Sequence, residues 1–409
     1  MKKILFISYD GMTDPLGQSQ VIPYLVGLTH FGYSFTILSC DKPEKYKEHK
    51  IYVSGLLKGL PIEWVSIPYH KNPPVLSSVY DLWQLKKTVK ELQKKHRFDM
   101  VHTRPGIPTL VALWMKKKYG TKFLNDIRGF WADERVDGGM WNLKNPLFKI
   151  LYRYFKNKED ECIRQADYNT CLTYKAKEII HGWKHLPQPV RIAVIPCSVD
   201  MELFDPATID PVTRESFRKE LGFTDDDFII SYLGSAGGWY LTDEMLRFCA
   251  LMLKQKPEAK FFFISNNRHA DILAQASRHR IPAEKILVRS GKRHEVPVLL
   301  SFSTYSIFFI KPCFSKLSSS PTKHGEIMAM GIPVITNSGV GDLAEIVGKY
   351  QAGYVLPDFS EASMLSIIQS ICEHPHPVNS AAIRLGANAY YNLSDAVQSY
   401  AAVYRQVLG

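Results

Sequence analysis

Short apolar runs recur along the chain, and each is followed by a small or polar turn and then by a segment of helical periodicity. This alternation is typical of parallel β-sheets whose strands are connected by helices. We predict seven strands in the first half of the chain, at residues 4–8, 35–39, 64–67, 100–103, 122–125, 168–172 and 192–195. Six more are predicted in the second half, at residues 228–233, 261–265, 286–288, 306–310, 334–336 and 353–356.

The strand pattern is interrupted near residues 196–206, where Asp205-Pro206 breaks the chain. A length of 409 residues also fits two domains better than one. We therefore expect two tandem, doubly wound, Rossmann-like α/β domains, residues 1–200 and 201–386. If they face one another, the carboxyl ends of both sheets border a shared cleft, which suits an enzyme with two substrates.

The charge is divided unevenly between the two halves. Residues 1–200 hold 31 Lys and Arg against 19 Asp and Glu, a net charge of +12, whereas residues 201–409 hold 20 against 21, a net charge of −1. A basic half of this kind indicates contact with phosphate, a membrane or another polyanion.

No apolar run approaches the roughly 20 residues of a membrane-spanning helix, so any membrane contact is expected to be peripheral. The seven cysteines form no CxxC pair, and the opening apolar run is too short for a signal peptide. These features favour a cytoplasmic protein.

The segment 318–335 carries the clearest candidate chemistry. Ser320 followed by Pro321 predicts an N-cap and a first turn, so a helix should begin there. Its free N–H groups, with Lys323 in the first turn, would attract a phosphate, and Glu326 could hold both hydroxyls of a ribose. The alternative is a capped core helix with one exposed glutamate.

Two further loops follow strands of the second half. Gly234, Ser235, Gly237 and Gly238 come directly after the first of these strands, and small residues there let the backbone approach a phosphate. The loop matches neither the dinucleotide-binding nor the nucleoside triphosphatase motif, and a plain tight turn is the alternative. Residues 340–345, which end at Glu345, follow strand 334–336 in the same way.

In the first half, a long loop at residues 10–20 contains Gly17 and Gln18. Long loops after a strand are commonly functional. His102 and Arg104 end the strand 100–103, although a lone histidine is more often structural.

Residues 126–135 are expected to form a second loop of the first half, crowded with charges and aromatic rings. Asp126, Arg128 and Glu134 lie in it. Such a mixture is hard to explain by solvation alone.

Two segments have both a plain and a functional interpretation. Asp225-Asp226-Asp227 resembles a metal-binding triplet, but it precedes a strand and is predicted to be a solvated turn. The helix opened by Asn145-Pro146 alternates aromatic and basic residues and could rest on an anionic bilayer. An amphipathic helix packed on its own sheet is at least as good an interpretation.

Residues 321–335, PTKHGEIMAMGIPVI, in a two-domain α/β chain resemble the family 4 retaining glycosyltransferases of GT-B fold. The resemblance covers essentially the whole chain, including Gly17, residues 126–129 and a closing segment, 387–409, similar to the family's terminal helix that crosses back to the first domain. It implies transfer of a sugar from a nucleotide sugar, bound by the second domain, to an acceptor hydroxyl at the first. It also implies no essential metal and no tightly bound cofactor.

The resemblance carries over residue by residue. Glu326 matches the second glutamate of the family's E-x7-E motif and is implied to bind the donor ribose, while Lys323 and the glycine loop face the diphosphate. Ser318 stands where the first glutamate is usual. The implied donor-side set is Gly234, Ser235, Gly237, Gly238, Ser320, Thr322, Lys323, Glu326 and Glu345.

The family's Arg and Lys after the first strand of the donor domain are missing, and Lys311, Lys316 or Lys323 is expected to supply that charge. Asp126 stands where many relatives place a histidine near the reacting carbon. The implied catalytic set is Asp126, Glu134 and Ser318, and the implied acceptor side is Gly17, Gln18, His102, Arg104 and Arg128.

The resulting hypothesis is a hexosyltransferase that uses a UDP-, GDP- or ADP-sugar in cell-surface polysaccharide or glycolipid synthesis. Its acceptor would be a glycan or lipid-linked glycan at the cytoplasmic face of an anionic membrane. The alternatives are a nucleotide-sugar 2-epimerase or a phosphorylase on the same fold, and a non-catalytic polyanion-binding protein. No motif for nucleic-acid binding is present.

Overall fold

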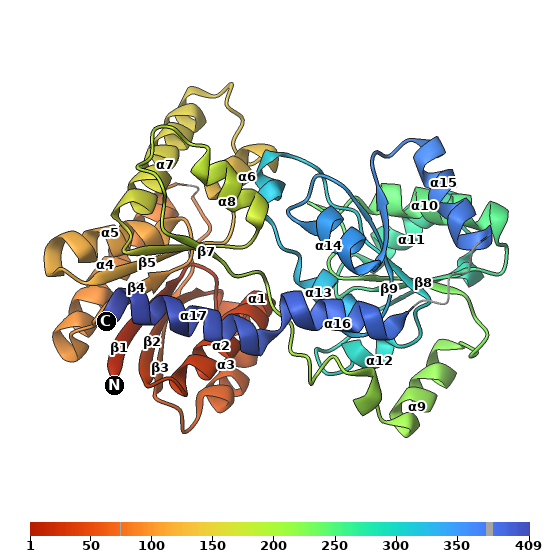
Figure 1. Ribbon diagram of the computed structural model, residues 1–409, viewed down its shortest axis with the longest axis horizontal. Coiled ribbons are helices and arrows are strands. Elements are labelled where there is room, and N and C mark those ends of the chain that lie inside the picture. The colour runs from red at the N-terminus through yellow and green to blue at the C-terminus, as the bar shows by residue number, and fades with distance from the viewer. Residues whose placement is uncertain (74, 374–378) are drawn as a thin grey trace. The chain divides into compact units, whose positions relative to one another are not determined.

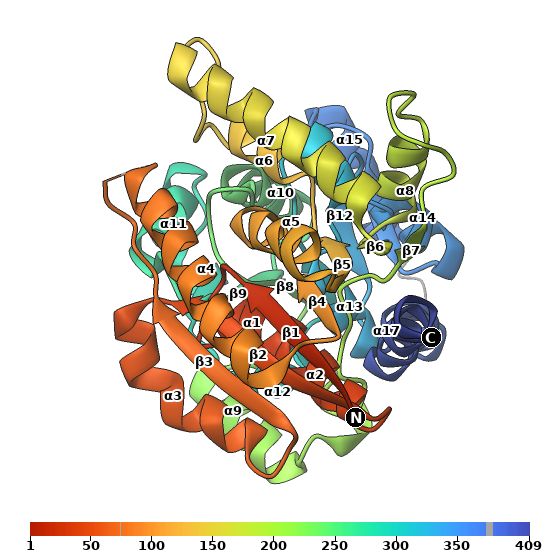
Figure 2. The ribbon, with the colours of Figure 1, turned by 90° about the vertical axis from the view of Figure 1, so that its left-hand side faces the viewer.

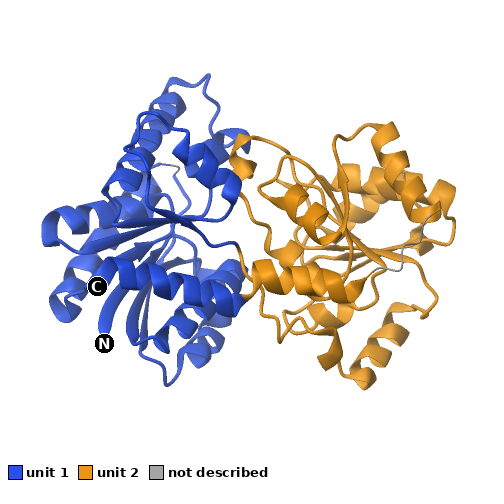
Figure 3. Cartoon of the chain, in the orientation of Figure 1, with its two compact units in different colours: residues 1–196, 393–409 blue, residues 197–392 orange. Residues whose placement is uncertain are grey.

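The computed structural model of the chain describes residues 1–73, 75–373 and 379–409 (Figure 1). These residues form two compact units, coloured separately in Figure 3: unit 1 comprises residues 1–196 and 393–409, and unit 2 comprises residues 197–392. Each unit is an α/β domain built on one parallel sheet.

The sheet of unit 1 has the strand order β3-β2-β1-β4-β5-β6-β7, and every pair is parallel. Its strands are β1 (Lys2–Ser8), β2 (Tyr33–Asp41), β3 (Ile62–Pro68), β4 (Met100–Thr103), β5 (Lys122–Ile127), β6 (Tyr168–Cys171) and β7 (Ile192–Val194). All seven expected strands are therefore confirmed. The central strands are apolar on both faces because helices cover both sides.

Two helical layers enclose this sheet (Figure 2). One layer contains α2 (Ile22–Thr29), α3 (Pro43–Leu57) and α17 (Leu393–Leu408). The other contains α4 (Leu76–His96), α5 (Ile107–Tyr119) and α7 (Pro146–Gln165). In α4 the buried Leu85, Val89 and Leu92 recur at helical spacing, which fixes the face turned to the sheet. The short helices are α1 (Pro15–Gln20), α6 (Trp131–Asp137) and α8 (Tyr174–His181).

The sheet of unit 2 has the order β10-β9-β8-β11-β12-β13 and is also entirely parallel. Its strands are β8 (Ile229–Leu233), β9 (Lys260–Ile264), β10 (Ile286–Arg289), β11 (Tyr305–Ile307), β12 (Val334–Asn337) and β13 (Gly353–Leu356). All six overlap the expected runs, although β11 ends three residues early. The doubly wound α/β prediction holds for both units.

The helices of unit 2 share one continuous core with this sheet. They are α9 (Pro211–Leu221), α10 (Thr242–Gln255), α11 (His269–Arg278), α12 (Val296–Leu300), α13 (Thr322–Ala329), α14 (Leu343–Tyr350), α15 (Glu361–Glu373) and α16 (Ser380–Tyr391). Three 3₁₀ turns, η1 (Pro206–Thr208), η2 (Ala283–Lys285) and η3 (Phe314–Ser318), lie between them.

The closing segment 387–409 is not one helix of the first domain. Its first residues complete α16, and Tyr391, which is 1% exposed, packs in the core of unit 2. Only α17 belongs to unit 1, where Val397, Tyr400 and Tyr404 pack in one layer. The anchoring of Tyr391 therefore ends the second unit at Asn392 rather than at residue 386.

Two local predictions are wrong. Residues 126–135 are not a loop, because Asp126 lies within β5 and Trp131 begins α6, whose first turn is held by the Glu159 carboxylate accepting from the Ala132 N–H at 2.9 Å. Ser320 is not the N-cap of α13; Pro321 occupies that position, and Ser320 Oγ instead accepts from the Cys197 N–H at 3.3 Å.

Asn145 caps α7 as expected, by accepting from the Leu147 N–H at 2.9 Å. Within the described ranges, none of the helices combines the length and the apolar character needed to cross a membrane.

Candidate active site

One acidic side chain is buried near the carboxyl end of the unit 1 sheet. Asp126 of β5 is 4% exposed, and the parallel register sets it beside Thr170 of β6, whose Oγ1 donates a 2.8 Å hydrogen bond to Asp126 Oδ1. The other carboxylate oxygen, Oδ2, lies 3.7 Å from His102 Nε2 and 3.9 Å from Arg128 Nε. The structure thus brings together Asp126, predicted to be catalytic, and two residues predicted for the acceptor side, His102 and Arg128.

These groups set one another's charge. Burial by itself would raise the pKa of the Asp126 carboxyl group, but Arg128, His102 and Arg104 together outweigh it and lower this pKa to about 2. Burial also lowers the pKa of His102, and Asp126 opposes only part of that effect. At neutral pH the cluster therefore holds an ionised carboxylate, two guanidinium groups and a neutral imidazole.

Two tyrosines of α17 complete the cluster of unit 1. Tyr404 Oη and His102 Nδ1 share a 2.8 Å hydrogen bond, and Arg128 Nη1 donates to Tyr400 Oη at 3.4 Å. The tyrosines are four residues apart, so both lie on the helix face that packs on the sheet. The last helix of the chain thereby fixes the orientation of His102 and Arg128.

The loop after β1 is held by another buried carboxylate. Asp41 accepts from the N–H and Oγ1 of Thr13 at 3.0 and 2.8 Å, and Gln18 Nε2 donates to the Thr13 carbonyl at 3.1 Å. A Cβ on Gly17 would overlap the backbone of Met12, so this position requires glycine for close packing. An acceptor-binding role for Gly17 and Gln18 stays a prediction.

Glu134 lies half-buried on α6 and belongs to a different cluster from Asp126. The guanidinium carbon of Arg135 stands 3.4 Å from the centre of the Trp131 ring. Burial lowers the pKa of Arg135 to about 10, and the carboxylates of Glu134 and Asp10 oppose that effect. A catalytic role for Glu134 stays a prediction.

In unit 2 the prominent buried charge is a cation. Lys323, in the first turn of α13, is 7% exposed, and its Nζ donates to Tyr232 Oη at 3.1 Å. The same ammonium group lies 3.6 Å from the ring centre of Tyr240 and 4.4 Å from that of Tyr232. Burial lowers the pKa of Lys323 well below its usual range, and Glu326 opposes only part of this effect.

The glycine loop lies against this lysine. A Cβ on Gly234, whose φ is +126°, would stand 2.5 Å from Lys323 Nζ, so only glycine leaves room for the ammonium group. The carbonyl of Ser235 accepts from Tyr232 Oη at 2.5 Å, which joins the loop to the same cluster.

The amides of this loop are mostly occupied within the protein. The N–H of Gly234 donates to the Ile264 carbonyl, that of Ala236 to Asn267 Oδ1, and that of Gly237 to Thr242 Oγ1. We expected these amides to approach a phosphate. Their existing partners make side-chain cations the better anion ligands here.

A second cation approaches the loop. A Cβ built on Gly237, whose φ is +76°, would stand 2.7 Å from Arg268 Nη1. Arg268 follows β9 and precedes α11, so it supplies a basic group beside the loop where the sequence lacks the family's residues. Lys316, another candidate for that charge, stands 3.8 Å from the ring centre of Trp239.

Glu326 is buried one turn further along α13, and its carboxylate forms an ion pair with Arg293, whose side chain is 40% exposed. The guanidinium of Arg293 also lies 4.7 Å from the ring centre of Phe204. One carboxylate oxygen, Oε1, is therefore engaged in this structure.

The remaining donor-side residues do not all join the Lys323 cluster. Ser318 Oγ donates to the Ser315 carbonyl at 2.6 Å inside η3, and Thr322 is half-buried at the start of α13. Gly238 is exposed in the loop, and Glu345 is exposed in the first turn of α14. Over the described part of the chain, no hydrogen bond or ion pair joins Glu345 to Lys323 or Glu326.

Sequence reasoning missed Arg268, Arg293, Tyr232 and Tyr240. Both arginines sit in short polar runs directly after strands β9 and β10, the signal that identified the other loops. The tyrosines look like ordinary core residues in the sequence. Among the described residues, no group of three or more His, Cys, Asp or Glu side chains is arranged to hold a metal ion.

Comparison with known proteins gives this arrangement a class. The family description "Glycosyltransferase Family 4" matches residues 24–203, and "Glycosyl transferases group 1" matches residues 213–390, so the two matches together cover most of the chain. Both units thus have the architecture of a GT-B glycosyltransferase. The chain is thus similar to family 4 in its first unit and to the group 1 glycosyl transferases in its second, which confirms the resemblance predicted from the sequence.

Individual relatives are distant. EpsD of Bacillus subtilis is 26% identical over 210 residues, which is 49% of each chain, and the alignments span about half or less of the length of the curated relatives. Sucrose-phosphate synthase from Thermosynechococcus elongatus has a TM-score of 0.77 at 14% identity and 99% coverage of both chains. HepE of Anabaena, solved with UDP-glucose, has a TM-score of 0.69 at 13% identity, covering 99% of this chain and 100% of that one. The structural likenesses establish the fold.

Proposed function

We propose that the chain transfers a sugar, with retention, from a nucleotide diphosphate sugar bound by unit 2 to an acceptor hydroxyl bound by unit 1. The observation that carries the proposal is Lys323, a buried ammonium group surrounded by aromatic rings beside a glycine loop and a second cation, Arg268. Such a site is stabilised by an anion. HepE, a neighbour of the same fold, was solved with UDP and with UDP-glucose.

In the proposed reaction the bond between the anomeric carbon and the diphosphate breaks through an oxocarbenium-like state. Lys323 and Arg268 stabilise the negative charge that develops on the leaving diphosphate. The acceptor hydroxyl forms the new bond, and its proton passes to the leaving phosphate oxygen. The positive charge at the diphosphate comes from these side chains, so activity is expected to persist in a chelator.

Glu326 is proposed to bind the donor ribose with the oxygen that does not face Arg293. On the acceptor side, the proposal assigns Asp126 to a polar contact near the reacting carbon through the cluster it forms with His102 and Arg128. The net charge of +12 in residues 1–200 supports an acceptor on an anionic surface. We propose a glycan or lipid-linked glycan at the cytoplasmic face of a membrane.

The decisive experiment is a thermal-shift screen of the purified chain with UDP, GDP, ADP and their sugars. A ligand that binds only the folded protein raises the melting temperature according to its affinity. Glu326→Gln should lower the affinity for any nucleotide that stabilises the protein by about 10-fold, because a charged hydrogen-bond acceptor is lost. The exposed Glu284→Gln is the control and should leave this affinity unchanged. If no nucleotide or nucleotide sugar stabilises the protein, the transferase proposal is wrong.

A nucleotide-sugar 2-epimerase is the second candidate, because it shares the fold and the donor. It would convert the nucleotide sugar without any acceptor. If the nucleotide sugar is isomerised in an incubation without acceptor, the protein is an epimerase and the transferase proposal is wrong.

A further inference from the structure

The outer surface of the α4–α5–α7 layer of unit 1 carries exposed apolar residues that the fold does not use. On α4, Leu76, Val79, Tyr80 and Trp83 are between 47% and 66% exposed. Their spacing of three, four and seven residues places them in a single row along the helix. We call this row the α4 stripe. Exposed apolar rows of this kind mark interaction surfaces.

Helix α7 of the same layer has a second row. Leu147, Ile150 and Tyr154 recur at spacings of three and seven residues and are between 45% and 65% exposed. Crossover helices begin at the carboxyl edge of a parallel sheet, and both rows occupy the first halves of their helices. The two rows therefore lie toward the edge of the unit 1 sheet that carries Asp126.

Lysines accompany both rows. Lys87 Nζ stands 5.6 Å from the ring centre of Trp83, Lys118 stands 5.6 Å from that of Trp114, and Lys158 stands 5.8 Å from that of Tyr154. Tryptophan and tyrosine with adjacent lysine are favoured where one end of a side chain is apolar and the other is wet, as at a bilayer interface.

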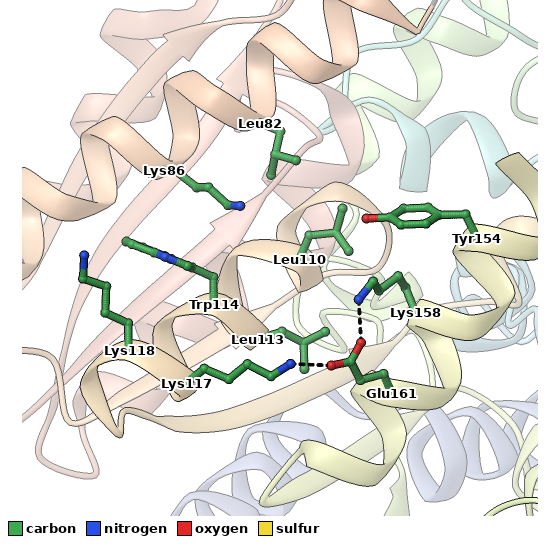
Figure 4. Close-up of a pocket in the computed structure, with 10 residues that line it drawn as sticks. All are labelled: Leu82, Lys86, Leu110, Leu113, Trp114, Lys117, Lys118, Tyr154, Lys158 and Glu161. Atoms are coloured by element: carbon green, nitrogen blue, oxygen red, sulfur yellow. Dashed lines mark hydrogen bonds and ion pairs between the residues drawn. The ribbon is translucent and has the colours of Figure 1, made fainter.

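A groove of about 420 Å³ lies among these helices (Figure 4). Its apolar lining comes from Leu82, Leu110, Leu113, Trp114 and Tyr154, and its charged lining comes from Lys86, Lys117, Lys118, Lys158 and Glu161. Four lysines and one glutamate give a net charge of +3.

The positive charge of the groove is only partly balanced. Glu161 accepts from both Lys117 and Lys158 at 2.6 Å, so one carboxylate serves two lysines, as the dashed lines in Figure 4 show. Among the residues the structure describes, Lys86 and Lys118 form no ion pair. An apolar lining with unbalanced lysines matches an amphiphile that carries a negatively charged head.

We propose that this face of unit 1, comprising the α4 stripe, the α7 row and the lysine groove, docks on an anionic phospholipid bilayer and binds a phosphate headgroup in the groove. The inference rests on the proposed function for the identity of the acceptor, a lipid-linked glycan. It adds which surface meets the membrane.

Helix α3, in the opposite layer of unit 1, is less suited to an anionic surface than the α4 stripe. Helix α3 also exposes Ile51 and Tyr52, but its solvent face carries Glu44 and Glu48 among its lysines, and Glu48 pairs with Lys45 at 3.1 Å. An anionic surface would repel those carboxylates. No acidic side chain is exposed along the α4 stripe, because Asp81, which lies between Tyr80 and Trp83 in the sequence, is fully buried.

The docked face is joined to the acceptor side of the unit. The inner face of α7 holds α6 through Lys156, which pairs with Asp133 at 2.8 Å and with Glu159 at 3.0 Å. Glu159 in turn accepts from the Ala132 N–H at the start of α6. If α7 binds the membrane, these contacts also fix the position of α6, the helix that carries Trp131, Glu134 and Arg135.

The test is sedimentation of the full chain with phosphatidylcholine vesicles, with and without phosphatidylglycerol. Wild type should bind only the anionic vesicles. Lys86→Gln with Lys118→Gln should weaken binding about 30-fold, at about fivefold per lysine near an anionic surface. Val79→Ser with Trp83→Ser should weaken it about 10-fold through lost apolar burial. All four positions tolerate change without loss of core packing, which unchanged melting temperatures would verify.

Matched control variants lie on α3. Lys47→Gln with Lys50→Gln, and Ile51→Ser with Tyr52→Ser, remove the same chemistry from exposed positions of the opposite layer and should leave binding within about twofold. Loss of binding in the α3 variants but not in the α4 variants would overturn the proposed face. So would a wild-type chain that sediments with neither vesicle.

Binding to heparin, a soluble polyanion, distinguishes membrane docking from general polyanion binding. If heparin binds as tightly as the vesicles and the Val79→Ser, Trp83→Ser variant is unaffected, the surface recognises soluble polyanions and the membrane proposal is wrong. Thermal shifts with nucleotides are measured on the same variants. Intact nucleotide shifts with failed docking overturn only the docking surface, whereas vesicle binding without any nucleotide shift overturns only the proposed function.

Discussion

The two units bury opposite charges, and they balance them in different ways. In unit 1 the buried Asp126 carboxylate is surrounded by basic groups of its own domain, His102, Arg104 and Arg128. In unit 2 the buried Lys323 ammonium is surrounded by the rings of Tyr232 and Tyr240. Within the described residues no carboxylate oxygen lies within ion-pair distance of Lys323, because Glu326 pairs with Arg293.

This difference separates structure from ligand binding. A buried charge that has partners holds its domain together, and removing one partner is costly. A buried charge without an ionic partner carries a desolvation cost that a ligand of opposite sign can offset. We therefore interpret the charge of Asp126 as balanced by its own domain before any ligand binds, and the charge of Lys323 as balanced only when an anion binds.

The largest effect is expected for Asp126→Asn. The variant removes the buried carboxylate that faces His102 and Arg128, so the free energy of unfolding should fall by about 3 kcal/mol at neutral pH. Urea unfolding followed by circular dichroism measures it. The exposed Asp226→Asn is the control and should change stability by less than about 0.5 kcal/mol. A stable Asp126→Asn variant would mean that the cluster is not structural and would break the comparison.

Lys323→Met should have the opposite pattern. Loss of the ammonium group should weaken nucleoside diphosphate binding about 100-fold, the scale of one strong charge-assisted contact. The free energy of unfolding should be unchanged or higher, because a buried charge without an ionic partner is removed.

Nucleotide titration by calorimetry and a parallel urea melt give both quantities for Lys323→Met. Lys349→Met, at an exposed position of α14, is the control. If Lys323→Met lowers the free energy of unfolding and leaves nucleotide affinity intact, Lys323 stabilises the fold, as the Asp126 carboxylate does, and does not bind the nucleotide.

The contrast between the units also marks how far the sequence could be interpreted. The strands were predictable because strands buried on both faces are short, largely apolar runs, as in 4–7 and 261–264. The glycine loop was identified because it follows β8 directly, and Lys323 was identified because Ser320-Pro321 indicates the start of a helix. Local signals of this kind survive without knowledge of the fold.

What could not be predicted depends on contacts between distant segments. The hydrogen bond between His102 and Tyr404 joins residues 302 positions apart. Arg268 lies beside Gly237 and precedes α11. Its own backbone has a φ of +57°, a left-handed conformation that no propensity of arginine predicts. Helix α6 was missed because its first turn is held by Glu159 on another helix rather than by a cap in its own sequence.

The contribution of the Asp126 cluster to the free energy of unfolding should depend on pH in the acid range. The folded-state pKa of Asp126 is about 2, below its ordinary value of 3.8, so the stabilisation is fully present above pH 4 and is lost as the pH falls toward 2. The difference in unfolding free energy between wild type and Asp126→Asn should therefore shrink by about 2 kcal/mol over that window. Urea melts at pH 5 and at pH 2.5 measure the change. An equal difference at both pH values would contradict the charge balance assigned to unit 1.

The smallest expected effect uses a feature that both units share. His102 in unit 1 and His324 in unit 2 are buried, and each shares a 2.8 Å hydrogen bond through Nδ1 with a tyrosine of a C-terminal helix, Tyr404 or Tyr391. The second ring nitrogens differ. Neither Nε2 atom has a hydrogen-bond partner among the described residues, but Nε2 of His102 lies 3.7 Å from the Asp126 carboxylate, within ion-pair distance, and no carboxylate lies that close to His324. Burial lowers the pKa of His324 to about 3.

Tyr391→Phe therefore leaves the His324 ring with no polar partner and should lower the free energy of unfolding by about 1 kcal/mol or slightly more. Tyr404→Phe should cost about half as much, because Asp126 still orients His102. Comparing urea midpoints at equal slope, with the half-buried Tyr350→Phe as control, tests the ranking. The reverse order would mean that Asp126 does not orient the imidazole of His102. It would also contradict the interpretation that the charge of Asp126 is balanced within unit 1.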